Sequence, residues 1–314
     1  MTMNKLPDIQ PAWLVFDISN LLYRTFFSQK NETDEELAGL ATHQALTTLN
    51  KYFKIYKPTK GVVMAFDRSS WRKEYTASDK CISKRPYKGT RRKDMTPSQR
   101  EKYARFMDHL AEFETLIIEH TTIVTLVYDS LEADDLIAGF CQLHSSAADP
   151  IMVITADSDM LQLAKNPGVT IISPATDKPQ SLADYFDDPE YYVFQKCLRG
   201  DSTDNVQSAY PRVRATRIRK AYEDPFERVQ LMKETWVSPA GTEFVVEQLF
   251  AENEKLIHLE KQPQDIRDLI EAVVTVAMQK KRQFSMFHIM KFIGKYKLNR
   301  IKDSIDQYIA LLSR

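Results

Sequence analysis

Four short apolar runs, each ending at or just before a carboxylate, constrain the fold of this chain more than any other feature. A fifth, weaker run has the same character, and the five cover 13–17, 61–66, 123–127, 151–155 and 169–172. Stretches with helical spacing separate them, as in 34–57, where apolar residues recur at about every third or fourth position. Strands that alternate with helices predict an α/β fold with a mostly parallel central sheet and helices on both faces.

Nine carboxylates gather in five short clusters, nearly all at these strand ends or at the starts of helices. They are Asp17, Asp67, Glu132, Asp134, Asp135, Asp157, Asp159, Asp201 and Asp204. The carboxyl ends of parallel strands meet at one edge of a sheet, where ligands of such folds bind. Carboxylates a few Å apart cannot all stay ionised unaided, and hard divalent cations with oxygen ligands neutralise them. We therefore expect metal-assisted chemistry, although a single aspartate at such a place is also typical of a helix N-cap or a turn.

The composition agrees with a globular enzyme that works in a reducing compartment. Of the 314 residues 43% are hydrophobic and 27% charged, and the three cysteines show no CxxC spacing. The six histidines lie away from the acidic clusters, which argues against zinc or histidine-base chemistry. No apolar run approaches the roughly 20 residues of a membrane span, and the N-terminus lacks a signal-peptide pattern. We expect a cytoplasmic protein (host cytoplasm if viral) with no membrane partner.

The net charge of zero conceals three basic blocks. Residues 80–105 hold ten Lys or Arg against two acids, residues 211–220 hold five basic residues and no acid, and 280–302 hold eight and no acid. One such block is usually a solvated face. Three blocks beside acidic clusters favour a protein that binds nucleic acid, since phosphate contacts supply most of that affinity.

The order of these segments predicts two domains. An α/β catalytic domain is expected at 1–186, with a basic insertion at 68–119 that becomes helical from an N-cap at Thr96 to about Phe113. The strand signal disappears after 187, so 187–314 is expected to be a helical region for duplex binding. Within it, a helix–turn–helix module is expected at 189–222.

The motifs together resemble the flap endonuclease and 5′–3′ exonuclease superfamily, and within it the phage-type ribonuclease H branch. The matching stretches are FDISNLLYR, AFDRSSWRKE, YKGTRR, EADDLIA, TADSDMLQL and LRGDSTDNV. Each motif alone is weak, but the ordered set is specific and runs from about 12 to 222. The resemblance implies a PIN-like 5′-nuclease core that hydrolyses phosphodiester bonds near the 5′ end of a duplex or flap.

The resemblance also implies two divalent metal ions, held by the nine acids named above, with Asp135 the least certain member. Mg²⁺ is the expected ion, and Mn²⁺ is expected to substitute for it. In the basic insertion, Lys88 is similar to the family's active-site lysine at the scissile phosphate, and Arg72 and Arg91 are implied to contact the same phosphate or its neighbour. The helices spanning 96–119 would form an arch over a single-stranded 5′ end.

Further basic or aromatic residues are expected to bind nucleic acid. They are Arg85, Tyr87, Arg92, Lys93, Arg212, Arg214, Arg217, Arg219 and Lys220. The family's glycine-rich turn after GDxxDN is missing, because no glycine occurs between Gly200 and Gly241. This departure puts the family's monovalent-cation site in doubt, and the five basic residues of 211–220 are expected to replace the turn by direct phosphate contacts.

Two other functions stay open on the residues alone. One is a PIN-like endoribonuclease, which shares the acids at the strand ends but lacks the basic arch; the other is a non-catalytic nucleic-acid clamp. The sequence does not show whether the substrate is a DNA duplex or an RNA–DNA duplex, as in the removal of RNA primers during DNA replication. It also does not show whether exonuclease or flap-endonuclease activity dominates. The last third, 223–314, could extend the duplex-binding face or dock a single-stranded-DNA-binding or clamp protein of replication.

Overall fold

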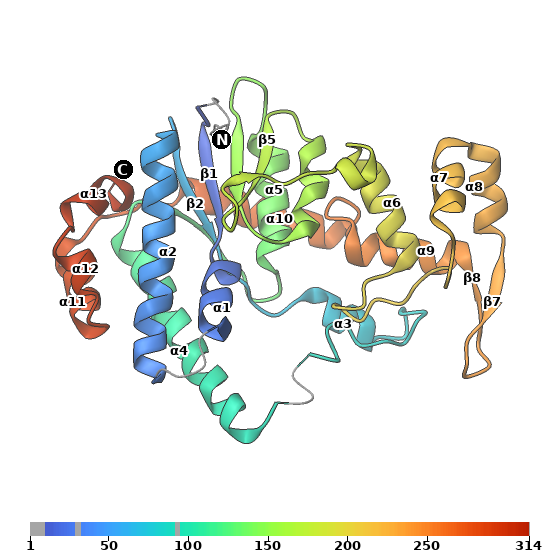
Figure 1. Cartoon of the computed structure of the whole chain (residues 1–314), viewed down its shortest axis with the longest axis horizontal. Coiled ribbons are helices and arrows are strands. Elements are labelled where there is room, and N and C mark those ends of the chain that lie inside the picture. Colours follow the sequence, from blue (N-terminus) through green and yellow to red (C-terminus); the bar gives the residue numbers. More distant parts are fainter. Residues whose placement is uncertain (1–9, 29–32, 92–94, 314) are drawn as a thin grey trace, which may run out of the picture. The chain divides into compact units, whose positions relative to one another are not determined.

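The computed structural model describes residues 10–28, 33–91 and 95–313, and the chain forms two compact units (Figure 1). The sheet unit comprises 1–68, 95–180 and 270–314, and the helical unit comprises 69–94 and 181–269. This division differs from the expected boundary after 186, because 69–94 belongs to the helical unit and 270–314 belongs to the sheet unit. Among the described residues, no helix combines the length and the apolar character needed to cross a membrane.

The sheet unit is built on a six-stranded sheet in the order β3-β2-β1-β4-β5-β6. All neighbouring pairs are parallel except β5 and β6. The strands are β1 (Trp13–Asp17), β2 (Gly61–Ala65), β3 (Val124–Leu126), β4 (Ile151–Ile154), β5 (Val169–Ser173) and β6 (Lys178–Pro179). The first five lie in the predicted apolar runs, and the predicted α/β class with a mostly parallel sheet is confirmed.

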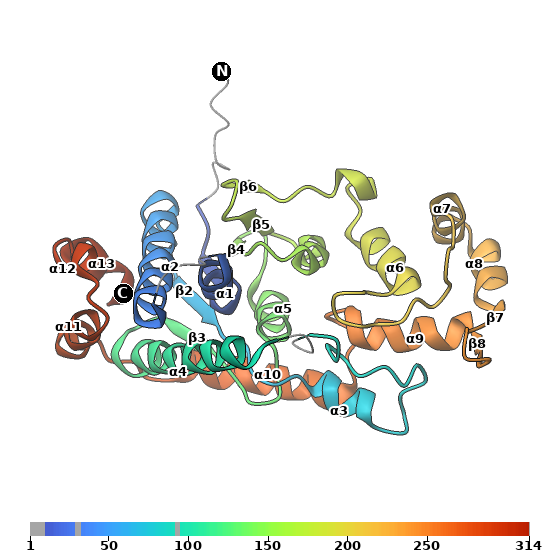
Figure 2. The ribbon, with the colours of Figure 1, turned by 60° about the horizontal axis from the view of Figure 1, so that its bottom comes forward.

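Both faces of the sheet are buried, which explains why its strands read as continuous apolar runs. Leu14 and Phe16 face a core that includes α2 (Asp34–Tyr56), α11 (Met286–Lys295) and α13 (Asp306–Leu312). On the other face, the Trp13 ring meets Phe140 of α5 (Ala133–His144) edge-on, with 5.5 Å between ring centroids. Figure 2 shows α2 and α5 on opposite sides of the strands. This unit also holds α1 (Ile18–Ser28), η1 (Ser158–Lys165) and α12 (Asn299–Lys302).

Helix α4 (Pro97–His120) begins as predicted, but its second half packs in the core of the sheet unit. Thr96 is its N-cap and accepts a hydrogen bond from the Gln99 N–H at 3.3 Å. The helix continues past the predicted end at Phe113, and Phe106, Leu110 and Ile117 are buried in the core of the sheet unit. The expectation of an arch over all of 96–119 is therefore wrong for the second half of this segment, whose apolar face is needed by the sheet.

The helical unit has a core of its own, centred on α6 (Pro189–Arg199) and α7 (Ala215–Glu223). As predicted, these two helices flank the RGDSTDN segment. The unit also holds α3 (Trp71–Ala77), η2 (Ala183–Tyr185), α8 (Pro225–Met232), α9 (Val246–Ile257) and the start of α10 (Gln264–Gln279). The prediction of helices alone after 187 is wrong, because β7 (Thr235–Val237) and β8 (Glu243–Val245) form a hairpin. Three-residue strands are too short to show a period of two.

Close packing of α10 against α5 generates a first prediction. A Cβ atom at Gly139 would lie 2.2 Å from the Ile270 Cγ2 atom. A Gly→Ala change inside a helix normally stabilises by about 0.5–1 kcal/mol. Here we expect Gly139→Ala to lower the free energy of unfolding by about 1–3 kcal/mol, because the added methyl group overpacks the contact. Urea denaturation measures the change. The control is Gly294→Ala in α11, where the new Cβ meets nothing within 4 Å and no loss is expected; equal effects at both sites would contradict the packing described.

Candidate metal centre and basic loop

The end of β1 and the segment that follows β2 each carry a carboxylate whose residue is held by hydrogen bonds within the sheet unit. The Asp17 carboxylate accepts hydrogen bonds from the Asn20 N–H at 3.0 Å and from the Thr155 hydroxyl at 3.2 Å. The Asp67 N–H donates to the Ser19 hydroxyl at 2.9 Å, and its Oδ1 accepts from the Ala133 N–H at 2.8 Å. Asp67 thereby connects the end of β2 to the first turn of α5.

Asp17 is the most strongly perturbed of these carboxylates. It is 5% exposed. Burial, followed by the negative charges of Asp67 and Asp157, raises the pKa of the Asp17 carboxyl from 3.8 to about 8. The hydrogen bonds from Asn20 and Thr155 act in the opposite direction but do not outweigh these effects. Asp17, Asp67 and Asp157 are therefore close enough for their charges to interact, as expected for acids at the carboxyl ends of adjacent parallel strands.

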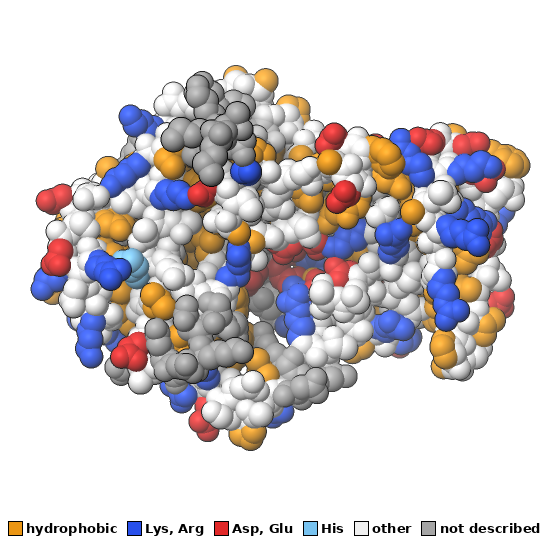
Figure 3. Space-filling view, viewed as in Figure 1, with side chains coloured by type: hydrophobic (Ala, Val, Ile, Leu, Met, Phe, Trp, Pro, Cys, Tyr) orange, Lys and Arg blue, Asp and Glu red, His pale blue; other side chains and the backbone are white. Residues whose placement is uncertain are grey.

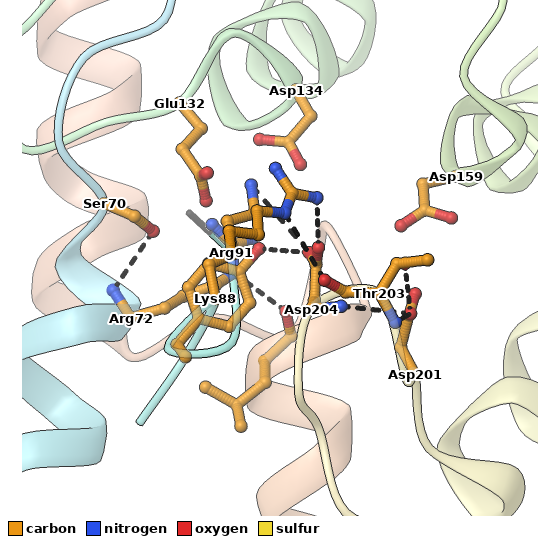
Figure 4. A network of polar contacts seen from close by, with 12 residues as sticks. Ser70, Arg72, Lys88, Arg91, Glu132, Asp134, Asp159, Asp201, Thr203 and Asp204 are labelled. Atoms are coloured by element: carbon orange, nitrogen blue, oxygen red, sulfur yellow. Dashed lines mark hydrogen bonds and ion pairs between the residues drawn. The ribbon is translucent and has the colours of Figure 1, made fainter. Parts of the chain in front are cut away.

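Three more carboxylates lie at the start of α5. Glu132, Asp134 and Asp135 each offer an oxygen within 4.8 Å of the others, close enough to hold one metal ion. Figure 4 shows Glu132 and Asp134 projecting from the beginning of this helix. Asp135 is fully buried, and its Oδ2 accepts a hydrogen bond from the Glu132 N–H at 3.4 Å, so part of its role is to cap the helix.

Asp157 and Asp159 follow β4 and open η1. Asp157 is the N-cap of this short helix and accepts from the Asp159 N–H at 2.9 Å. The Asp157 N–H donates to the Thr155 hydroxyl at 3.1 Å, and that hydroxyl also donates to Asp17. Thr155 thus couples the ends of β1 and β4. Both Asp157 and Asp159 are partly exposed.

The two remaining acids belong to the helical unit, in the loop that follows α6. Gly200 ends α6 with φ 71°, and a Cβ there would lie 2.5 Å from the Val206 carbonyl oxygen, so only glycine fits. Asp201 accepts from the Thr203 N–H at 2.8 Å and from the Lys196 Nζ at 2.9 Å. Burial alone would raise the pKa of Asp201, but the hydrogen bonds from Lys196 and Thr203 outweigh it and lower the pKa to about 2.

Asp204 contacts the basic loop, residues 84–91 of the same unit. Its Oδ1 accepts from Arg91 at 2.5 Å, its Oδ2 accepts from the Tyr87 hydroxyl at 2.6 Å, and Lys88 Nζ lies 3.8 Å from Oδ2. Figure 4 shows Lys88 and Arg91 beside Asp204. Arg91 is exposed and Lys88 half-buried, whereas Tyr87 and Arg72 are buried.

The basic residues of 211–220 divide into paired and unpaired groups. Arg217 pairs with Glu234, Arg219 with Glu223 and Lys220 with Glu227. Arg212 and Arg214 are exposed and have no ion-pair partner among the residues that the structure describes. Figure 3 shows Lys and Arg side chains gathered over α7 and α8. Arg85 is also exposed, whereas the predicted nucleic-acid contacts Arg92 and Lys93 lie outside the described residues.

The turn before α7 contains no glycine, yet its backbone adopts a left-handed conformation. Arg212 has φ 60°, in a region that costs a non-glycine residue of order 1 kcal/mol or more. The side chain placed there is one of the two arginines that have no ion-pair partner in the described part of the chain. The turn therefore places a cationic side chain at a left-handed backbone position, where glycine is the commonest residue.

Sequence reasoning missed the residues that support these groups. Thr155 donates to the Asp17 carboxylate, and Ser19 accepts from the Asp67 N–H. Glu252 of α9 accepts hydrogen bonds from the backbone N–H groups of Ile82 and Ser83, just before the basic loop. Ser19 and Thr155 each lie two positions from a predicted acid, so their sequence positions could have identified them as supporting residues. No sequence pattern identifies Glu252, because its partners are about 170 residues away in sequence.

The raised pKa of Asp17 generates a second prediction. Its folded pKa, about 8, lies above its unfolded value, so the folded state binds the proton more tightly. Its contribution to stability is complete below about pH 4 and is lost as pH rises towards 8. In EDTA, we expect the melting temperature of Asp17→Asn to exceed that of wild type at pH 8.5 and to approach it at pH 5. Asp149→Asn, which removes a partly exposed partner of Lys60, should not show this pH dependence. A difference in melting temperature between Asp17→Asn and wild type that does not change with pH would contradict the burial of this acid among like charges.

Comparisons with known proteins agree with this geometry. The model of the 5′–3′ exonuclease, N-terminal resolvase-like domain, matches residues 12–192. A DNA polymerase I of Caldicellulosiruptor bescii is 28% identical over 208 residues, which cover 62% of this chain and 22% of that protein. A 5′–3′ exonuclease of Buchnera aphidicola is 22% identical over 206 residues, which cover 62% of this chain and 63% of that protein. The match spans less than two thirds of either relative's length.

Solved structures show the same fold. A phage T5 protein co-crystallised with metal ions aligns with a TM-score of 0.61 and 18% identity, over 84% of this chain and 99% of that one. A phage T5 flap endonuclease in a product complex with DNA and metal ions aligns equally well, over 85% of this chain and 99% of that one. Because the family model covers more than half of the chain, the protein belongs to the family of the 5′–3′ exonuclease, N-terminal resolvase-like domain.

Proposed function

We propose that this chain is a structure-specific 5′ nuclease, which cleaves phosphodiester bonds near the 5′ end of duplex or flapped DNA with the help of divalent metal ions. The observation that carries this proposal is the set of carboxylates at one edge of the parallel sheet, three of which interact through their charges. Family membership supports it, as does the fold shared with a T5 flap endonuclease that was solved with DNA and metal ions.

The residues of the sheet unit fit hard divalent cations. The ligand set is all carboxylate oxygen, which suits Mg²⁺ or Mn²⁺ and not a softer metal. The oxygens of Glu132, Asp134 and Asp135 lie within 4.8 Å of one another. The like charges around Asp17 are costly without a cation, which is a second independent sign of fit. Asp17, Asp67, Glu132, Asp134 and Asp157 would hold the ions, and Mg²⁺ is the proposed natural one.

Bound ions of this kind lower the pKa of a coordinated water and neutralise charge on the leaving oxygen. The chain's own residues supply the remaining functions. Thr155 donates to the Asp17 carboxylate and fixes its orientation, as outer-sphere groups do at metal sites. Ser19 holds the Asp67 backbone by accepting from its N–H. Lys88 supplies a positive charge for the scissile phosphate. Arg212 and Arg214, which lack acidic partners among the described residues, are positioned on an exposed turn to contact the duplex backbone.

A third prediction concerns the acids at the start of α5. We expect Asp134→Asn to slow cleavage of a 5′-labelled flap or nicked duplex by at least about 100-fold, because it removes one anionic ligand of the ion. EDTA should abolish wild-type cleavage. The rate is measured with Mg²⁺ and with Mn²⁺. Asp129→Asn is the matched control, because Asp129 is an exposed acid of the loop before the same helix.

Three results of this experiment would contradict the proposal. Cleavage that survives EDTA would exclude metal assistance. Binding of 5′-ended duplex without any cleavage would instead indicate a non-catalytic clamp, and cleavage confined to single-stranded RNA would indicate an endoribonuclease.

A fourth prediction separates chemistry from binding at the basic loop. We expect Lys88→Ala to lower the single-turnover cleavage rate by about 100-fold or more, since it removes a cation that acts on developing charge. DNA affinity in Ca²⁺, measured by fluorescence anisotropy, should change by less than about tenfold, as for the loss of one phosphate contact. Lys80→Ala, an exposed lysine before the same loop, should affect neither quantity strongly. Equal losses of rate and affinity in Lys88→Ala would make Lys88 a phosphate anchor only.

A further inference from the structure

A buried carboxylate that has no part in the reaction proposed above lies in the middle of α9. Glu252 is 1% exposed, and each of its oxygens accepts a hydrogen bond from a backbone group just before the basic loop. Oε2 accepts from the Ile82 N–H, and Oε1 accepts from the Ser83 N–H at 3.0 Å and from the Cys81 thiol at 3.8 Å. A buried carboxylate is tolerated only where such donors satisfy it, so these bonds fix the segment 81–83 against α9.

The segment that Glu252 holds leads directly into the basic loop. Residues 78–91 contain no helix or strand, so the hydrogen bonds of regular secondary structure do not fix their conformation. Lys84 follows the two bonded N–H groups and Lys88 comes later in the loop; both have left-handed backbones, with φ 51° and φ 54°. A lysine keeps such a conformation only where its surroundings hold it. The basic loop therefore depends on contacts from outside, and Glu252 supplies those at its start.

The next residue of α9 holds a different loop. Asn253 is 1% exposed, and its Nδ2 donates to the carbonyl oxygens of Cys197 and Gln207, each at 2.8 Å. Cys197 belongs to the last turn of α6, and Gln207 follows the RGDSTDN segment, which carries two of the nine predicted acids. One side-chain amide therefore fastens both ends of the loop 197–207 to α9.

Glu252 and Asn253 bring the two loops to the same turn of one helix. Successive residues of a helix project about 100° apart, so adjacent positions can reach different neighbours. The two loops also bond to each other, because the Lys88 N–H donates to the Asp204 carbonyl oxygen at 2.8 Å and the Asn205 side chain donates to the Pro86 carbonyl oxygen at 2.9 Å. Each of these contacts involves a backbone group, so metal binding by the carboxylates of the loop does not require any of them to break.

We propose that Glu252 and Asn253 are positioning residues of the nuclease reaction. Glu252 fixes the start of the basic loop so that Lys88 is presented to the scissile phosphate, and Asn253 fixes the acid-bearing loop 197–207 against the same helix turn. Both side chains are buried, so they act through these loops and not by contact with the substrate. This inference rests on the proposed nuclease function, because it assigns roles within that reaction.

The first test measures the two loops directly, by hydrogen exchange and mass spectrometry of the full-length protein without DNA. Glu252→Gln keeps the shape of the side chain but turns an amide N–H₂ group towards a backbone N–H. We expect it to speed exchange of 78–91 by about tenfold and to leave 197–207 unchanged. Asn253→Ala, which removes both donors, should show the reverse pattern. Exchange in β1 of the sheet unit is the control for global destabilisation and should stay unchanged in both variants. Wild-type exchange of 78–91 in Glu252→Gln overturns the proposal, whether or not the protein is a nuclease.

The second test compares the rate with the metal requirement. We expect Glu252→Gln to lower the single-turnover cleavage rate by about tenfold, as for a misplaced catalytic group, with the Mn²⁺ concentration for half-maximal rate within about twofold of wild type. Asn253→Ala should raise that Mn²⁺ concentration by about fivefold or more, because the loop that it holds carries predicted metal ligands. Glu247→Gln, an exposed acid of the same helix, is the matched control and should change neither quantity. Equal shifts of both quantities in Glu252→Gln and Asn253→Ala would contradict the separate roles proposed.

The third test separates positioning of Lys88 from a general structural role. In a Lys88→Ala background, Glu252→Gln should cost less than about twofold in rate, because residues that act through one group are not additive. Equal losses in the wild-type and Lys88→Ala backgrounds would overturn the proposal. Absence of cleavage by wild type would contradict the nuclease function and, with it, the catalytic part of this inference, and hydrogen exchange would still decide whether Glu252 and Asn253 hold the two loops.

Discussion

Repulsion between carboxylates that the backbone brings together is the constraint on which the sheet unit depends. Parallel strands must end at the same edge, and β1, β2 and β4 each end at or just before an aspartate. Among the described residues, no cationic side chain relieves this repulsion at Asp17, and the groups that favour its ionised form are the hydrogen-bond donors Asn20 and Thr155. Repulsion between the acids lowers the free energy of unfolding, and a cation that binds between them raises it again.

In the helical unit, by contrast, basic side chains neutralise the acids. Lys196 pairs with Asp201, and Arg91 pairs with Asp204, so each carboxylate is satisfied within the fold. The consequence appears in the pKa values, which shift upward at Asp17 and downward at Asp201. Two aspartates that look alike in sequence therefore have opposite electrostatic environments: like charges surround Asp17, and the Lys196 cation lies beside Asp201.

Local patterns could be predicted from the sequence because they depend on neighbouring residues. The five apolar runs gave the parallel strands, and Thr96 with Pro97 gave the start of α4. The β7–β8 hairpin was missed, since three residues are too few to show alternation. The packing of 270–314 with the sheet unit was also missed, because amphipathic spacing shows that a helix has a buried face but not which surface covers it.

The candidate site also has a part that local sequence predicts and a part that depends on contacts between distant residues. The acids at strand ends follow from local order, whereas the attachment of Tyr87 to Asp204 joins residues 117 positions apart. A match to a motif also cannot show whether a carboxylate oxygen is already occupied. This is why Asp201 and Asp204 were grouped in sequence with acids whose surroundings differ.

The two edge strands of the sheet are both very short: β3 has three residues and β6 has two, one of them Pro179. An edge of this kind presents few unpaired backbone N–H and C=O groups, and proline removes one donor outright. Strand addition from a second chain or a partner peptide therefore finds almost no template on this sheet. The same short edges give two copies of the sheet unit little opportunity to pair edge to edge.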